Sequence, residues 1–119
     1  MITEARETLA AELADVGVPV WTEWPDKFVP PCVLLVPATG TYITSGGYGG
    51  QYVLALDVIA VTGRGSYDVV LPSLESLVER VLTYTADWSL SGVDSPSLVT
   101  VGGTEYLATV IHISKHVQE

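Results

Sequence analysis

The stretch over residues 51–62 constrains the fold of this chain more than any other segment. Two sets of mostly apolar side chains alternate along it, and it is the longest strand candidate in the sequence. A second apolar run over residues 32–37 is rich in β-branched and aliphatic types, which suits a strand covered on both faces. Because a Gly-rich stretch separates the two runs, together they predict a long hairpin.

Two amphipathic segments predict helices that flank these strands. Apolar side chains recur every three or four residues over 3–16 and again over 68–85, which is helical spacing. Gly17 supplies a left-handed stop to the first helix, and Pro19 prevents its continuation. The apolar stripes consist of Leu9, Leu13 and Val16 in the first helix, and of Val70, Leu74, Leu77 and Val81 in the second.

The remaining segments add two further strand regions and a loop. Residues 18–22 predict a short strand, placed at a sheet edge because Pro19 cannot donate to a ladder. Residues 98–101 and 104–117 predict a second hairpin around a Gly-Gly turn. We expect a polar loop over 86–96, anchored by the side chains of Trp88 and Leu90.

The order of these elements, α-β-β-β-α-β-β, predicts an α+β fold. Strands joined in hairpins, with the helices kept apart from them, favour an antiparallel or mixed sheet with two helices packed on one face. The chain has 119 residues, the usual size of one domain, so we expect a single domain over residues 1–119.

The charge balance excludes several classes of partner. Lys and Arg number 5 against 14 Asp and Glu, for a net charge of −9. Such an excess of acidic residues argues against binding to the phosphates of nucleic acid and against adsorption to anionic membranes, because like charges repel. No apolar run approaches the ~20 residues of a transmembrane helix. We therefore expect no sequence-specific nucleic-acid binding and no membrane association.

The residues most often used in catalysis predict structural roles in this chain. His112 and His116 share one strand face but lie roughly 13 Å apart, too far to bind one metal ion together. The single Cys32 opens an apolar strand and is interpreted as a small buried hydrophobe. Residues 63–66 form a glycine-containing turn without the third glycine of a dinucleotide-binding fingerprint, because Asp68 stands there. The sequence thus predicts no catalytic residue, no cofactor, no metal site and no enzyme activity.

One segment stands out as a candidate contact with another protein. Residues 38–50 are rich in Gly, Ser and Thr, and tyrosines within and beside them supply contact area at low entropic cost. The alternative interpretation is a flexible hairpin tip. We expect this loop to be mobile in a free subunit and ordered in an assembly. Its candidate contact residues are Tyr42, Ile43, Tyr48 and Tyr52.

The order of elements and several short segments carry a family resemblance over nearly the whole length. The segments are Val16-Gly17-Val18-Pro19-Val20, Trp24-Pro25-Asp26-Lys27-Phe28-Val29-Pro30-Pro31, Tyr52-Val53-Leu54-Ala55-Leu56-Asp57-Val58 and Gly63-Arg64-Gly65-Ser66. In this pattern the chain resembles the tail-terminator (tail-completion) proteins of long-tailed bacteriophages, especially those that infect actinobacteria.

The resemblance implies a structural role in a virion. Tail terminators are small α+β domains that form six-fold rings, which cap the finished tail tube and join it to the connector of the head. We therefore expect a homohexameric ring with the tail tube protein and head-tail connector proteins as partners, assembled in the host cytoplasm and retained in the tail or neck of the virion. The family has no catalytic residues to carry over.

Other functions remain open at this point. A neighbouring neck protein would give a similar sequence pattern. A non-viral small acidic binding domain, or a small enzyme or ligand-binding domain with an unrecognised pocket, is a further alternative. An acidic mimic of nucleic acid is disfavoured, since charged residues make up only 16% of the chain.

Overall fold

A computed structural model describes residues 2–22, 31–38, 42–45, 51–62, 67–101 and 104–118 of the chain. These residues form one mixed seven-stranded sheet with two helices, so the predicted α+β class is confirmed. In chain order the elements are α1 (Ile2–Leu13), the 3₁₀ turn η1 (Ala14–Val16), β1 (Val20–Trp21), β2 (Cys32–Pro37), β3 (Ile43–Ser45), β4 (Gln51–Val61), α2 (Tyr67–Tyr84), β5 (Ser89–Val93), β6 (Ser97–Val101) and β7 (Thr104–Gln118).

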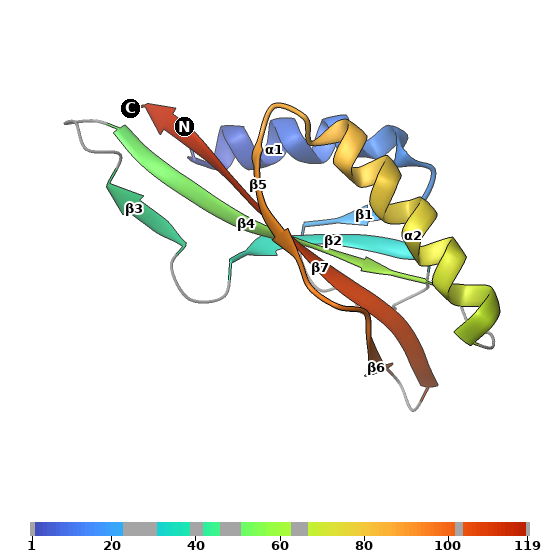
Figure 1. Cartoon of the computed structure of the whole chain (residues 1–119). Helices are drawn as coiled ribbons and strands as arrows, with labels where there is room; N and C mark the ends of the chain where they lie inside the picture. The colour runs from blue at the N-terminus through green and yellow to red at the C-terminus, as the bar shows by residue number, and fades with distance from the viewer. Residues whose placement is uncertain are drawn as a thin grey trace.

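The two longest strands, β4 and β7, run antiparallel through the centre of the sheet (Figure 1). On the other side of β4, β2 pairs with it antiparallel, with Cys32 opposite Val61, which confirms the predicted hairpin. Strand β1 adds to β2 in parallel and lies at the edge, as the sequence predicted. Strands β5 and β6 both pair with the remaining side of β7, β5 with its C-terminal half and β6 with its N-terminal half.

Both helices cover the same face of the sheet, and the core lies between them and the strands (Figure 1). Every second residue of β4, from Leu54 to Ala60, is buried in this core, because alternate side chains of a strand share one face. The predicted apolar stripes of the two helices are confirmed, because their side chains pack against the strands in this core. Those stripe residues are Leu9, Leu13, Val16, Val70, Leu74, Leu77 and Val81.

The predicted end of the first helix is confirmed at Gly17. This glycine has a φ of 97°, in the left-handed region that residues with a side chain rarely adopt. Arg80 of α2 donates a hydrogen bond from Nη1 to the carbonyl oxygen of Val16, at 2.7 Å. The contact satisfies one of the carbonyl groups that the end of a helix leaves without a partner, and it ties α2 to the end of η1.

Two short strands add to the predicted order. Strand β5 lies inside the expected polar loop over 86–96, so that loop prediction is wrong in its middle. Its serines and glycine have low strand propensity, and pairing with β7 imposes the extended conformation. Trp88 is a buried anchor as expected, but Leu90 is 52% exposed and anchors nothing.

The other added strand, β3, lies inside the segment expected to be mobile. It pairs antiparallel with β4, with Ile43 opposite Leu54 and Ser45 opposite Tyr52. These three residues therefore form a strand with backbone partners within the single chain, and the expected mobility of the free subunit stays a prediction. The Gly-Gly turn before β7 and residues 63–66 lie outside the described residues.

Candidate functional site

The four predicted partner-contact residues differ in how far they are available to another protein. The side chains of Tyr42 and Tyr52 are half-buried and pack against the core beneath the helices. The carbonyl oxygen of Tyr42 also accepts a hydrogen bond from the backbone N–H of Ala55, at 2.8 Å. Ile43 is 38% exposed, and Tyr48 lies outside the described residues. Among the described contact residues, Ile43 thus has the largest exposed fraction.

The structure also assembles a cluster of ionisable side chains that the sequence did not predict. His112 of β7 lies directly opposite Asp57 of β4, so both side chains lie on the sheet face away from the helices. The Nδ1 atom of His112 is 2.7 Å from Asp57 Oδ1, and its Nε2 atom is 2.9 Å from Asp94 Oδ1. One imidazole therefore bridges two carboxylates, and we call this trio the Asp–His–Asp clamp.

The clamp favours the charged form of its histidine. The hydrogen bonds to Asp57 and then to Asp94 raise the pKa of His112 above its ordinary value. An ionised carboxylate only accepts hydrogen bonds, so an imidazole that bonds to two of them uses both nitrogens as donors. Because neither nitrogen remains free for a substrate proton, this geometry suits a structural role and does not suit a general base.

The three side chains of the clamp differ in their exposure to solvent. The side chain of Asp57 is 5% exposed, that of His112 37% and that of Asp94 57%. The clamp therefore extends from a buried carboxylate inside the sheet to one at the surface. Water and salt therefore screen the interaction of His112 with Asp57 less than its interaction with Asp94.

Further hydrogen bonds hold Asp94 at the corner between β5 and β6. Its backbone N–H donates to the carbonyl oxygen of Val110 at 2.9 Å, and its own carbonyl oxygen accepts from Thr109 Oγ1. Both partners belong to β7. The register of β5 on β7 shifts between Leu90 and Gly92, just before this corner. The clamp thus fastens an irregular edge of the sheet to its central strands.

The other ionisable candidates lie where the sequence placed them. Cys32 is fully buried in β2 beside Val61 and Ala108, and burial raises the pKa of its thiol to about 11. His116 is exposed on β7, opposite Val53. Within the part of the chain that the structure describes, no three His, Cys, Asp or Glu side chains are arranged to hold a metal ion.

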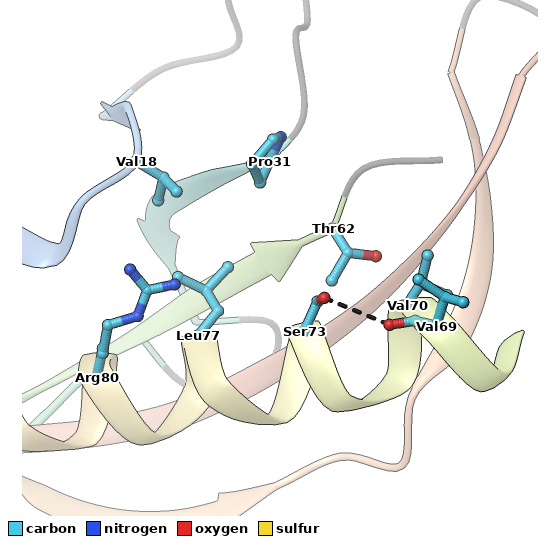
Figure 2. A pocket seen from close by; sticks show the side chains of 8 residues that line it. All are labelled: Val18, Pro31, Thr62, Val69, Val70, Ser73, Leu77 and Arg80. Carbon is cyan, nitrogen blue, oxygen red and sulfur yellow. Dashed lines mark hydrogen bonds between the residues drawn. The ribbon is translucent and has the colours of Figure 1, made fainter. Parts of the chain in front are cut away.

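A cavity of about 290 Å³ lies between α2, the start of β2 and the end of β4 (Figure 2). Its walls include the apolar side chains of Val18, Val70 and Leu77. Each of its polar side chains bonds to a backbone carbonyl oxygen, which leaves the cavity mainly apolar in character. These bonds run from Thr62 to Leu107 (3.0 Å), from Ser73 to Val69 (3.3 Å) and from Arg80 to Val16 (2.7 Å).

Comparisons with known proteins add no family assignment. No protein-family model matches the chain, and no curated protein matches its sequence. Neither described helix is long and apolar enough to cross a bilayer.

Proposed function

We propose that this chain is a structural protein of a long-tailed bacteriophage, a tail terminator whose ring caps the tail tube and joins it to the head connector. The observation that carries the proposal is the nearly whole-length sequence pattern described above. The α+β fold, one sheet with both helices on one face, agrees with it. This is the class of fold that the resemblance implies.

The surface of the described fold is compatible with ring formation. A closed ring joins two different surfaces of each subunit, because its contacts are heterologous. The sheet provides two different edges, with the two-residue strand β1 at one and β5 at the other. Its face opposite the helices provides a third surface. These elements are candidates for contacts with neighbouring subunits and with the tail tube.

The charge of the chain supports a position around a DNA channel. A net charge of −9 repels phosphates, so DNA would pass a ring of such subunits without adhering to it. The clamp supports a structural role too, since both nitrogens of His112 bond to carboxylates that fix the sheet edge.

The oligomeric state of the purified protein is the first test. Native mass spectrometry over a range of concentrations should show a closed oligomer, with six copies as the expected number, either alone or after addition of tail tubes. Cryo-electron microscopy of the assembled particle then places the ring. Density at the head-proximal end of the tail tube supports the proposal, and a ring bound only to the head side assigns the chain to the neck. A single copy at an asymmetric position contradicts both.

A further inference from the structure

A groove separates α2 from the corner between β5 and β6. Its volume is about 300 Å³, at the lower end of the range for ligand pockets. Leu74 and Val78 line it from the helix, and Val93 and Pro96 line it from the corner. We call it the α2–β5 groove. Its apolar lining provides a surface on which an apolar side chain of another molecule can be buried.

Exposed apolar side chains extend this lining along the edge of the sheet. Leu90, Val93 and Leu98 pair in register with Ile113, Ile111 and Leu107, which are core residues on the helix side. They therefore lie on the helix side of the sheet as well, yet they are 52%, 40% and 65% exposed. A row of exposed apolar side chains beside a groove is a candidate protein-interaction surface.

Acidic side chains at this groove determine the charge of a partner that can bind there. Glu75 and Glu79, one turn apart on α2, are exposed and line it, whereas the carboxylate of Asp94, another lining residue, bonds to His112. Its lining includes no Lys or Arg. A complementary partner therefore carries positive charge next to its apolar side chains.

A second copy of this chain fits these requirements poorly. Each copy has only 5 Lys and Arg against 14 Asp and Glu, so a second copy offers few cations to the groove. Of the three described cations, Arg80 already donates to the carbonyl oxygen of Val16, the ammonium group of Lys115 lies 5.7 Å from the centre of the Trp88 ring, and Arg6 lies on α1.

We propose that the α2–β5 groove binds a segment of a different protein in which an apolar side chain is flanked by Lys or Arg. The apolar side chain packs against Val78, Val93 and Pro96, and the flanking cations reach the carboxylates of Glu75 and Glu79. The inference goes beyond the proposed function and does not depend on it, because it rests on the groove and its charges alone.

The test uses the full chain and a fluorescent synthetic peptide of alternating Lys and Leu residues. Fluorescence anisotropy measures its dissociation constant, and NMR shift mapping locates the bound peptide. The double variant Glu75→Gln/Glu79→Gln should bind about threefold to tenfold more weakly, which is the loss expected for two exposed ion pairs. The matched control Glu7→Gln/Glu12→Gln removes two exposed carboxylates from α1 and should leave the affinity unchanged.

A second pair of variants tests the apolar contact without changing side-chain shape. Val93→Thr should weaken binding. The control is Val69→Thr, which changes an exposed valine on the opposite flank of α2 and should leave binding unchanged. Three outcomes would overturn the proposal. They are a dissociation constant weaker than about 1 mM, equal binding of a peptide with Glu in place of Lys, and equal losses in the groove and control variants.

Discussion

His112 and Asp57 face each other across β7 and β4, with 2.7 Å between Nδ1 of the imidazole and Oδ1 of the carboxylate. The two residues are 55 positions apart in the chain. Their contact lies in a sheet whose surrounding residues are mostly apolar, and it is extended to the surface by Asp94. The clamp therefore joins three separate segments, namely β4, β7 and the corner between β5 and β6.

The clamp predicts that stability depends on pH above the usual histidine range. Because the pKa of His112 is raised above 6.5 in the folded chain, the folded chain binds the imidazole proton more tightly than the unfolded chain does. The stabilisation from His112 is thus fully present below pH 6.5 and is lost as pH rises through the pKa of the folded state. Urea unfolding at about pH 6 and about pH 9 should show this loss in the native chain and a smaller one in His112→Gln. An equal pH dependence in both chains would contradict the prediction.

The two carboxylates of the clamp should contribute unequally. Asp57→Asn removes a buried acceptor and should lower the pKa of His112 more than Asp94→Asn, whose exposed carboxylate is screened by water. We expect Asp57→Asn to destabilise the fold by about 1–3 kcal/mol and Asp94→Asn by less than about 1 kcal/mol. NMR titration of the His112 ring protons and urea unfolding measure the two effects. Equal pKa changes in both variants would argue against this order.

Gly17 should tolerate a side chain poorly. At a φ of 97°, an added Cβ is strained, and it would lie 2.8 Å from Nη1 of Arg80. Gly17→Ala should therefore lower the free energy of unfolding by about 1–2 kcal/mol. The matched control is Gly92→Ala, since a Cβ there meets no atom within 4 Å. Thermal unfolding of both variants checks the prediction, which fails if Gly92→Ala is the more damaging change.

Local patterns in the sequence were sufficient to predict most of the elements. The helical spacing of Leu74 and Leu77, the left-handed stop at Gly17 and the apolar runs of β2 and β4 are each set by neighbouring residues, so no long-range contact is needed to recognise them. Strand β5 differs because its serines and glycine acquire an extended conformation from pairing with β7.

The clamp was not predictable because it depends on strand register. The sequence showed an aspartate, Asp57, within an otherwise apolar strand, and a histidine, His112, in another strand. Only the pairing of β4 with β7 places the two opposite each other, and only the turn after β5 brings Asp94 to the second ring nitrogen. A single charged residue in a buried strand is the signal that indicates such a partner, since an unpaired buried charge is costly.

The last prediction concerns Ile43, the exposed one among the predicted contact residues that the structure describes. Its side chain is 38% exposed on β3, so Ile43→Thr keeps a β-branched residue in the strand and should change the free energy of unfolding by less than about 1 kcal/mol. If β3 contacts a neighbouring subunit or the tail tube, the same change should weaken ring assembly, because it removes apolar contact area. Val69→Thr on α2, where the valine is 64% exposed, is the matched control. Native mass spectrometry of the oligomer and a head-to-tail joining assay measure the effect. Normal assembly of Ile43→Thr would show that β3 only connects β2 to β4.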